Sequence, residues 1–316
     1  MGRLAGRETT RVHAIVNPFG GKKIGLRLLD EARRRIEEAD IRFLVYETEY
    51  AGHARDYARS MLLEADDVFV PIGGDGTLFD VVNGLLARDD EQRVRIAPVP
   101  GGASNYVGQA LGLAVDDGTE AARQILAGEV RRVDLGRVRS GERTVYGVCA
   151  LSWGYVEELA ACAERNRWMG AQRYTAAGFH EIWKAGPREA RITFDEEEVV
   201  EDRFSLFLCV NTEYMGRDRV VFPEAKIDDG YWDVVFCRAL SAAHLADVKA
   251  RMTRGDGSWL ASEHVEHRRV RRFSLEAGDS DPVNVDGEPN LPAPIRFEVE
   301  PGAVEMVGVA RGDEVK

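Results

Sequence analysis

A glycine-rich turn between a strand and a helix constrains this chain more than any other feature of its sequence. The apolar run Val68–Ile72 leads into Gly73-Gly74-Asp75-Gly76-Thr77, and apolar residues then recur at the spacing of an amphipathic helix. Glycine lacks a Cβ, so it can take a positive φ and let backbone N–H groups approach a phosphate beside a helix N-terminus. The segment predicts a phosphate-binding turn, with an ordinary tight turn as the alternative. A carboxylate beside anionic phosphates indicates that Asp75 binds a cation or takes up a proton.

Strand-like and helix-like segments alternate through the first part of the chain. Four short apolar runs, at 12–16, 43–46, 68–72 and 96–99, each end in a polar loop, and most of these loops contain glycine. This alternation is typical of βαβ units around a parallel sheet. The carboxyl ends of parallel strands lie along one edge of the sheet, where ligands bind, so we expect the loops to form a binding site there.

The pattern changes after about Val138, where strand-like segments follow one another with turns between them. Several of these segments alternate apolar and polar residues with a period of two, as half-buried antiparallel strands do. We therefore expect two domains. The first is an α/β domain over residues 9–138, completed by the C-terminal segment 300–312, and the second is a β-rich, mainly antiparallel domain over residues 139–299.

Composition limits the classes of protein to consider. The chain has 316 residues, of which 44% are hydrophobic and 30% are charged, so it is long enough for two cores. Its formal net charge of −12 disfavours binding to nucleic acid, because the long-range field repels phosphate backbones. The four cysteines are far apart, and no run is long enough to span a membrane. We expect a cytoplasmic protein with reduced thiols and no transmembrane segment.

Six sequence blocks, taken in order, resemble the diacylglycerol kinase catalytic superfamily, which includes bacterial lipid kinases and the sphingosine and ceramide kinases. The resemblance implies an N-terminal α/β domain like that of NAD kinases, related to the Rossmann fold, and a C-terminal, mainly antiparallel β-sandwich domain that binds the lipid. It also implies an active site in the cleft between them. The blocks are VNPFGGKK at 16–23, TEYAGHA at 48–54, GGDGTLFDVVNGL at 73–85, PGGASN at 100–105, AKIDDGYWDV at 225–234 and VDGEP at 285–289.

The resemblance assigns roles to individual residues. Asp75 matches an acidic active-site position, Glu288 matches the proton acceptor of bacterial lipid kinases, and Asp286 lies close to it. A hairpin turn is the alternative for the DGE sequence. The positions that match ATP-binding residues are Asn17, Pro18, Phe19, Gly20, Gly21, Thr48, Gly73, Gly74, Gly76, Thr77, Gly101, Gly102 and Ala103, joined by Arg167 and Arg173.

A structural Mg²⁺ site is implied near the Asp-Asp-Gly turn. In bacterial members of the family an aspartate and main-chain oxygens hold this ion, and these positions correspond to Asp229 with the main chains of Lys226 and Tyr231. Oxygen ligands of this kind suit Mg²⁺. A plain Asp-Asp-Gly turn is the alternative.

The segment Trp153–Phe179 resembles the sphingosine and ceramide kinases more than the short bacterial diacylglycerol kinases. Glu158 occupies a substrate position that is acidic in that branch, but Ala160 stands where sphingosine kinases carry a second aspartate. A head group without a cation, as in ceramide or diacylglycerol, suits this loss. Basic and aromatic residues interleave over Arg165–Arg191, which predicts transient contact with a membrane surface, or else a helix that packs its aromatic residues in the second core.

Together these features predict an ATP-dependent lipid kinase that uses Mg²⁺ and phosphorylates a hydroxyl of a membrane lipid. The loop Gly102-Ala103-Ser104-Asn105-Tyr106 departs from the family's usual GTGND-like sequence. This departure leaves open a non-catalytic module that binds nucleotide or lipid, and the GGDGT turn, which NAD kinases share, leaves open an enzyme like NAD kinase. A homodimer is also left open.

Overall fold

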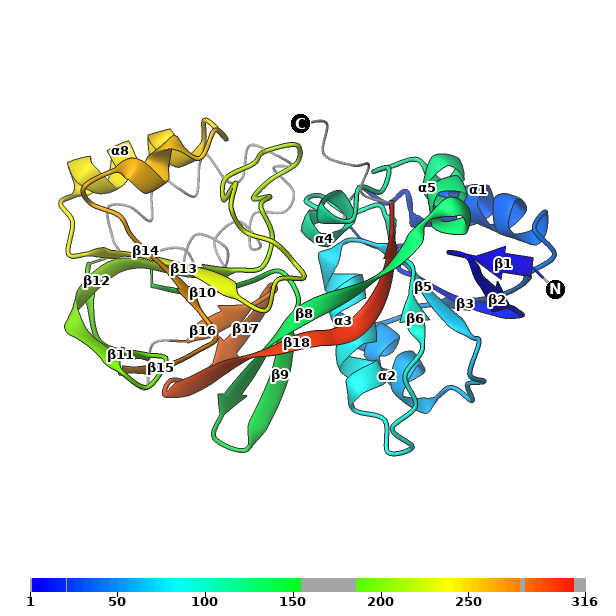
Figure 1. Ribbon diagram of the computed structural model, residues 1–316, viewed down its shortest axis with the longest axis horizontal. Helices are drawn as coiled ribbons and strands as arrows, with labels where there is room; N and C mark the ends of the chain where they lie inside the picture. Colours follow the sequence, from blue (N-terminus) through cyan, green and yellow to red (C-terminus); the bar gives the residue numbers. More distant parts are fainter. Residues whose placement is uncertain (1, 21, 155–185, 279–281, 310–316) are drawn as a thin grey trace. The chain divides into compact units, whose positions relative to one another are not determined.

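The computed structural model describes residues 2–20, 22–154, 186–278 and 282–309 (Figure 1). The chain divides into two compact units. The first comprises Met1–Asp134, Gly216–Asp218 and Pro301–Lys316, and the second comprises Leu135–Met215 and Arg219–Glu300. Of the stretch 165–191, for which we expect membrane contact or a helix packed in the second core, residues 165–185 lie outside the described residues.

The sheet of the first unit is parallel. Its strands lie in the order β4-β3-β5-β6, β7 pairs with β5, and the last part of β18 pairs with β6 through Met306 and Ile96. Strands β3 and β5 are buried along almost their whole length, which is why they read as continuous apolar runs. The bounds are β3 Arg11–Val16, β4 Arg42–Glu47, β5 Val68–Gly73, β6 Arg95–Ile96, β7 Val99–Pro100 and β18 Ile295–Gly308; a hairpin of β1 Gly2–Leu4 and β2 Arg7–Thr9 lies apart.

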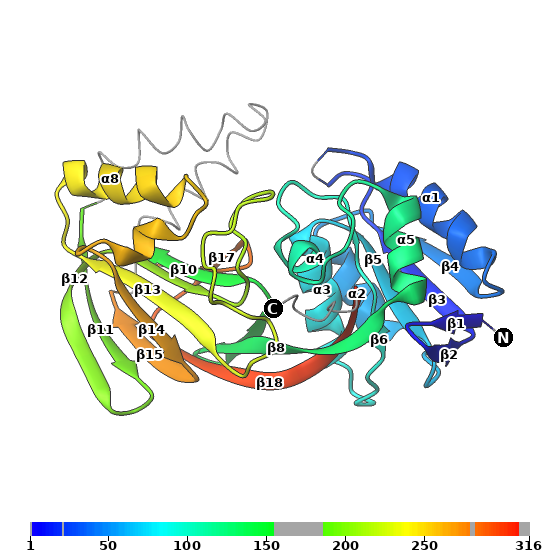
Figure 2. The ribbon, with the colours of Figure 1, turned by 45° about the horizontal axis from the view of Figure 1, so that its top comes forward.

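Helices connect these strands in the manner of a doubly wound fold. Helix α1 leads from β3 to β4, whereas α2 and α3 lead back across the sheet in the opposite direction, so right-handed crossovers place them on the opposite face. In agreement, α2 packs on α3, and α1 packs on α5 (Figure 2). The bounds are α1 Gly25–Glu37, α2 His53–Ser60, α3 Asp75–Leu86, α4 Tyr106–Ala110 and α5 Gly118–Ala127.

The second unit is mainly antiparallel. Strands β17-β16-β10-β12-β11-β15-β18 follow one another, β13 and β14 extend from β12, and β8 pairs with β9. Helix α8 Ala242–Met252 and the short 3₁₀ helix η2 Ser258–Ala261 complete the described part. The strand bounds are β8 Glu129–Ser140, β9 Arg143–Gly147, β10 Ala150–Gly154, β11 Arg188–Phe194, β12 Glu198–Val210, β13 Trp232–Arg238, β14 Glu266–Val270, β15 Arg272–Ala277, β16 Val283–Val285 and β17 Glu288–Leu291.

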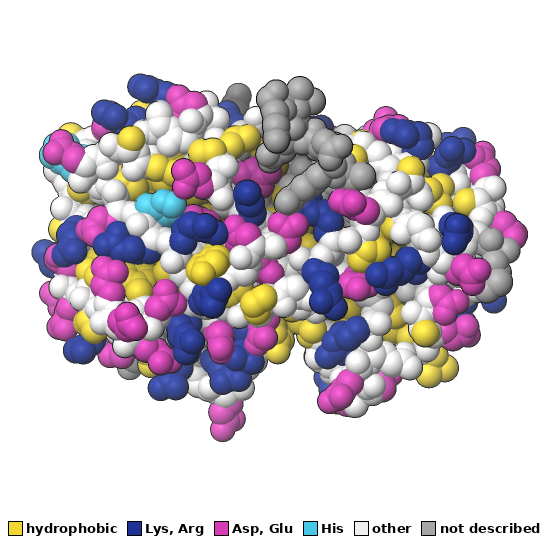
Figure 3. Space-filling view, viewed as in Figure 1, with side chains coloured by type: hydrophobic (Ala, Val, Ile, Leu, Met, Phe, Trp, Pro, Cys, Tyr) yellow, Lys and Arg dark blue, Asp and Glu magenta, His cyan; other side chains and the backbone are white. Residues whose placement is uncertain are grey.

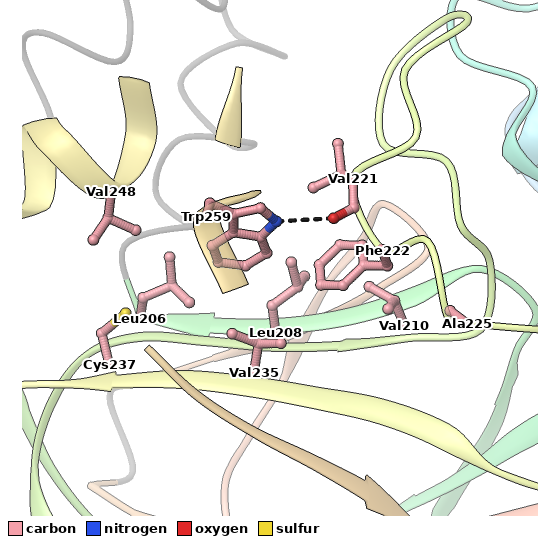
Figure 4. Packing of buried hydrophobic residues seen from close by; sticks show 10 residues of the cluster. All are labelled: Leu206, Leu208, Val210, Val221, Phe222, Ala225, Val235, Cys237, Val248 and Trp259. Atoms are coloured by element: carbon pink, nitrogen blue, oxygen red, sulfur yellow. Dashed lines mark hydrogen bonds between the residues drawn. The ribbon is translucent and has the colours of Figure 1, made fainter. Parts of the chain in front are cut away.

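A hydrophobic cluster in the second unit is centred on Trp259 (Figure 4). The indole is fully buried, and its Nε1 donates a hydrogen bond to the backbone oxygen of Val221 at 2.9 Å. Cys237 belongs to the same cluster, and burial raises the pKa of its thiol to about 12. A thiol with so high a pKa stays protonated and acts as a small apolar side chain.

The observed architecture confirms the predicted fold class, with α/β organisation followed by an antiparallel β-rich part. One detail differs: the strand expected at 96–99 is two short pieces, β6 and β7. Pro98 lies between them and has no N–H group for a ladder hydrogen bond. No helix among the described residues is long and apolar enough to cross a membrane. On the face shown in Figure 3, cationic and anionic side chains are interspersed.

Candidate active site

The glycine turn lies where β5 ends and α3 begins. Strand β5 ends at Gly73, Gly74 is the N-cap residue in an extended conformation, and Asp75 begins the helix. None of these glycines has a positive φ. Close packing is the reason for two of them: a Cβ on Gly73 would lie 2.6 Å from Oγ1 of Thr77, and a Cβ on Gly74 would lie 3.0 Å from Cα of Gly102. The positive φ expected for this turn is therefore not what requires glycine.

A second loop, at 100–105, packs directly on this turn. The N–H of Gly101 donates to the carbonyl oxygen of Gly73 at 2.7 Å. A Cβ on Gly102 would lie 2.3 Å from Cα of Gly74, so the two loops approach with only backbone between them. The Asn105 side chain closes the second loop, since its Oδ1 accepts the N–H of Gly102 at 2.7 Å and its Nδ2 donates to the oxygen of Gly102 at 2.9 Å.

Two further loops lie at the ends of the adjacent strands. Asn17 follows β3, and its N–H donates to the oxygen of Ile72 at 3.1 Å, while its Oδ1 accepts the N–H of Phe19 at 3.0 Å. Phe19 is 68% exposed in this loop. Thr48 follows β4 and is buried, with its N–H donating to the oxygen of Val16. The structure thus brings four of the predicted nucleotide-binding loops to one edge of the sheet.

The Asp75 carboxylate is half-buried in this arrangement. Its Oδ1 accepts the N–H of Val107 at 3.4 Å. Burial raises the pKa of the Asp75 carboxyl above its ordinary value, although backbone N–H groups of Tyr106, Val107 and Asn105 lower it part of the way. A carboxyl group with such a balance of desolvation and hydrogen bonding is typical of a functional site.

Asp286 lies in the turn between β16 and β17, in the second unit. Its carboxylate accepts the backbone N–H groups of Val148, Cys149 and Ala150, the last two at 2.9 and 2.7 Å. Asp286 has a φ of 53°, and Gly287 beside it has a φ of 92°. The carboxylate therefore holds three backbone donors. Glu288 is the first residue of β17, and its side chain is outside the described part.

The residues of the predicted structural Mg²⁺ site form other interactions. Oδ2 of Asp229 accepts a hydrogen bond from Arg269 at 2.6 Å, and Oδ1 accepts the N–H of Tyr231 at 3.1 Å. The guanidinium groups of Arg269 and Arg271 lie 4.8 and 4.7 Å from the centre of the Tyr231 ring. Arg269 thus engages one oxygen of Asp229, and metal binding there by Asp229, Lys226 and Tyr231 stays a prediction. The described residues contain no cluster of three or more His, Cys, Asp or Glu side chains arranged to bind a metal.

Several predicted site residues cannot be placed. Gly21, Arg167, Arg173 and Glu158 all lie outside the described residues. Conversely, three residues of the site edge were missed as site residues: Asn105, Gln109 and Asp116. Asn105 belongs to the PGGASN block, so its loop was a signal, but nothing in the local sequence indicates that Gln109 or Asp116 contacts residues 216–218.

Two family profiles cover most of the chain. Residues 11–138 match the diacylglycerol kinase catalytic domain. Residues 149–308 match the YegS C-terminal domain, described as a β-sandwich domain like that of NAD kinase. The chain therefore belongs to the diacylglycerol kinase catalytic superfamily, and it is a lipid kinase by membership of that family.

Curated relatives carry lipid-kinase names from both branches of the superfamily. Sphingosine kinase 1 of Arabidopsis thaliana is 28% identical over 83% of this chain and 63% of its own length. A diacylglycerol kinase of Staphylococcus carnosus is also 28% identical, over 91% of both chains. Because the two identities are equal, they do not separate the branches, and the closer resemblance to sphingosine and ceramide kinases stays a prediction.

Solved structures share the fold. A protein described as a diacylglycerol kinase from Bacillus anthracis superposes with a TM-score of 0.78 at 24% identity, over 96% of this chain and 99% of its own. An NAD kinase from Archaeoglobus fulgidus gives a TM-score of 0.51 at 14% identity, over 95% and 93% of the two chains. The NAD-kinase-like character of the fold is confirmed, whereas an NAD kinase is only a distant structural neighbour.

Proposed function

We propose that this lipid kinase transfers the γ-phosphate of ATP to a hydroxyl group of a membrane lipid, with Mg²⁺. The observation that carries the proposal is the convergence of the loops at Asn17, Thr48, Gly74 and Gly102 on one sheet edge, around the half-buried Asp75. Backbone N–H groups and glycine-lined surfaces suit a polyphosphate. Phosphoryl transfer depends mainly on positioning and charge stabilisation, so such a frame meets its chief requirement.

The proposed roles of the acidic residues follow from their surroundings. Asp75 would hold Mg²⁺ or a proton at the glycine turn; Mg²⁺ usually binds one or two carboxylates and takes further ligands from substrate phosphates, so a single carboxylate fits. When bound, Mg²⁺ offsets the negative charge that develops on the phosphate oxygens. Glu288 would accept the proton of the lipid hydroxyl. Asp286, which holds three backbone N–H groups, would position the turn that leads to Glu288.

The lipid that the sequence favours has an uncharged head group. Ala160 lacks the carboxylate that would meet a sphingoid amine, and an unpaired ammonium group would be costly to desolvate. We therefore propose ceramide or diacylglycerol as the substrate class, with Glu158 in the lipid-binding part. Transient contact of the basic and aromatic stretch 165–191 with a bilayer belongs to the same proposal, as does a cytoplasmic location. Homodimer formation stays a prediction.

Transfer of labelled phosphate from ATP tests this function. The full chain is incubated with Mg²⁺ and radiolabelled ATP, and mixed micelles present ceramide, sphingosine, diacylglycerol or monoacylglycerol, with NAD as a separate acceptor. We expect label in ceramide or diacylglycerol, and loss of that label in Asp75→Asn and Glu288→Gln variants. Label in NAD alone would support the NAD kinase alternative. Nucleotide binding with no labelled product would support the non-catalytic module.

A further inference from the structure

Residues Gly216–Asp218 belong to the first unit, although the chain on either side of them belongs to the second. The Gln109 side chain, from α4, holds them. Its Oε1 accepts the N–H of Asp218 at 2.7 Å, and its Nε2 donates to the backbone oxygens of Gly216 at 3.3 Å and Ser104 at 2.8 Å. Ser104 lies in the loop at 100–105, so one amide side chain links residues 216–218 to the glycine-lined edge.

Asp116 brings the Arg217 side chain to the same edge. The backbone N–H of Asp116 donates to the oxygen of Pro100 at 2.9 Å, which fixes Asp116 beside the loop at 100–105. Its Oδ2 accepts hydrogen bonds from both Arg217 and Lys22, and Lys22 belongs to the loop that follows β3. Arg217 is therefore held between two of the loops that we propose bind nucleotide.

The cluster of Lys22, Asp116 and Arg217 has two cations on one carboxylate, and the exposed Asp218 carboxylate lies 3.8 Å from Nε of Arg217. The backbone oxygen of Asp116 accepts a further hydrogen bond from Arg27 at 3.0 Å, and Arg27 is itself paired with Glu31 at 2.6 Å, so it adds no net charge. Burial alone would raise the pKa of the Asp116 carboxyl, but hydrogen bonds from Lys22 and Arg217 hold it below the ordinary value. Asp116 thus stays ionised, while the Lys22 and Arg217 side chains remain 46% and 37% exposed.

A guanidinium group has five N–H donors, and the bond to Asp116 uses one terminal nitrogen of Arg217. Asp218 lies near its Nε, at 3.8 Å, beyond hydrogen-bonding distance. The group can therefore bind a phosphate oxygen while Asp116 continues to hold it. A planar guanidinium held in place loses less conformational freedom on binding than a mobile one, which favours recognition of phosphate.

We propose that Arg217 binds the phosphate chain of the nucleotide, with Asp116 and Gln109 as the residues that position it. This inference rests on the proposed function, because it takes the glycine-lined edge as the nucleotide site. The ligand is a nucleoside polyphosphate, and the cluster recognises its phosphates and not its base. The phosphate of an anionic lipid head group is the alternative ligand for the same cations. The experiment distinguishes binding of nucleotide from binding of lipid.

The experiment measures the affinity of the full chain for ATP, ADP, AMP and adenosine by calorimetry, in Arg217→Gln, Arg217→Lys and Gln109→Leu variants. Arg219→Gln is the matched control, because Arg219 is exposed and lies two residues away. A hydrogen bond to a charged group is stronger than a neutral one, so we expect Arg217→Gln to weaken ATP binding about tenfold or more and AMP binding little. Arg217→Lys should restore part of the ATP affinity, and Gln109→Leu should lower it.

Several outcomes would overturn the inference. Equal ATP affinity in Arg217→Gln and the parent chain would remove Arg217 from the site, and equal losses for ATP, AMP and thermal stability would leave it a structural residue only. A loss confined to binding of phosphatidylserine vesicles would assign the cluster to lipid. Failure of this inference can be told apart from failure of the proposed function. A parent chain that binds ATP but labels no lipid contradicts the kinase reaction alone. A parent chain that binds no adenine nucleotide contradicts both the kinase reaction and phosphate binding by Arg217.

Discussion

The carboxylate of Asp286 accepts the backbone N–H of Cys149 at 2.9 Å across 137 residues of sequence. The same carboxylate accepts the N–H groups of Val148 and Ala150, on either side of Cys149. Three backbone donors on one side chain fix the turn before β17 against the start of β10. Asp286 therefore has a structural role in the second unit, whichever carboxyl group accepts the proton of the lipid hydroxyl in the proposed reaction.

Replacement of Asp286 by Asn should destabilise the fold. The amide puts an NH₂ group where an oxygen now accepts a backbone N–H, so at least one buried donor loses its partner, which costs about 1–3 kcal/mol. We expect the free energy of unfolding in urea to fall by that amount. Glu276→Gln is the matched control, because Glu276 is exposed on β15. Unchanged stability with lost turnover would instead place Asp286 in the chemistry.

Asp75→Asn should gain thermal stability relative to the parent chain as the pH rises, while turnover is lost. The pKa of Asp75 is raised above that of an unfolded aspartate, so the folded state favours the protonated form and loses stability as the pH rises through the folded pKa. Asparagine is uncharged and avoids that loss. The melting temperature of the variant minus that of the parent should therefore increase as the pH rises above about pH 4, near the pKa of an unfolded aspartate.

Differential scanning fluorimetry across that pH range measures the difference. Asp89→Asn is the control, because its side chain is 94% exposed just after the same helix. A difference that shrinks as the pH rises would show that the ionised Asp75 stabilises the fold.

Local patterns in the sequence were enough to predict the turn after β5 and the change from α/β to antiparallel structure. Apolar spacing and glycine position are short-range signals, and they set the secondary structure. The long-range contacts of the predicted site residues are different in kind. Asp229 pairs with Arg269 across 40 residues, and Asp116 pairs with Arg217 across 101. Such pairs depend on how the chain folds back on itself, so no local pattern encodes them.

The glycines illustrate the same limit. The sequence shows that Gly74 and Gly102 lack side chains, and for the turn at Gly74 a positive φ was one expected reason. The observed reason is the close approach of the two loops. A Cβ atom added at position 102 would lie only 2.3 Å from Cα of Gly74. This contact joins positions 28 residues apart, so only the folded chain reveals it.

Replacement of Asp67 by Asn should weaken the first unit. The Asp67 side chain is fully buried and accepts two hydrogen bonds from Arg11, at 2.8 and 2.7 Å, while His13 Nε2 lies 3.0 Å away. Removing one partner of a buried ion pair costs about 3–5 kcal/mol, but Arg11 is 22% exposed and keeps a second partner, Glu64, at 2.9 Å. We therefore expect a smaller loss, of about 1–3 kcal/mol, at pH 7 in urea unfolding, with the partly exposed Asp66→Asn variant as the control.

The effect should also depend on pH. Burial alone would raise the pKa of the Asp67 carboxyl, but hydrogen bonds from Arg11, from the N–H of Glu64 and from His13 bring it below the ordinary value. A lowered pKa gives stability that is present above the unfolded pKa and is lost as the pH falls through the folded one. The difference between parent and variant should therefore shrink below about pH 4. A constant difference would show that packing, and not charge, sets the loss.

Gly102→Ala should impair nucleotide binding, whereas Gly186→Ala should not. The new Cβ at position 102 would lie 2.3 Å from Cα of Gly74, so the two backbone loops must separate. No atom lies within 4 Å of a Cβ at position 186, which is exposed and belongs to none of the loops that we propose bind nucleotide. Both variants keep their backbone N–H donors, so loop spacing changes only at position 102. We expect ATP affinity in calorimetry to fall at least tenfold for Gly102→Ala, from a loss of about 1.4 kcal/mol or more, and to stay near the parent value for Gly186→Ala. Equal affinities in both variants would show that the spacing of these loops does not control the nucleotide site.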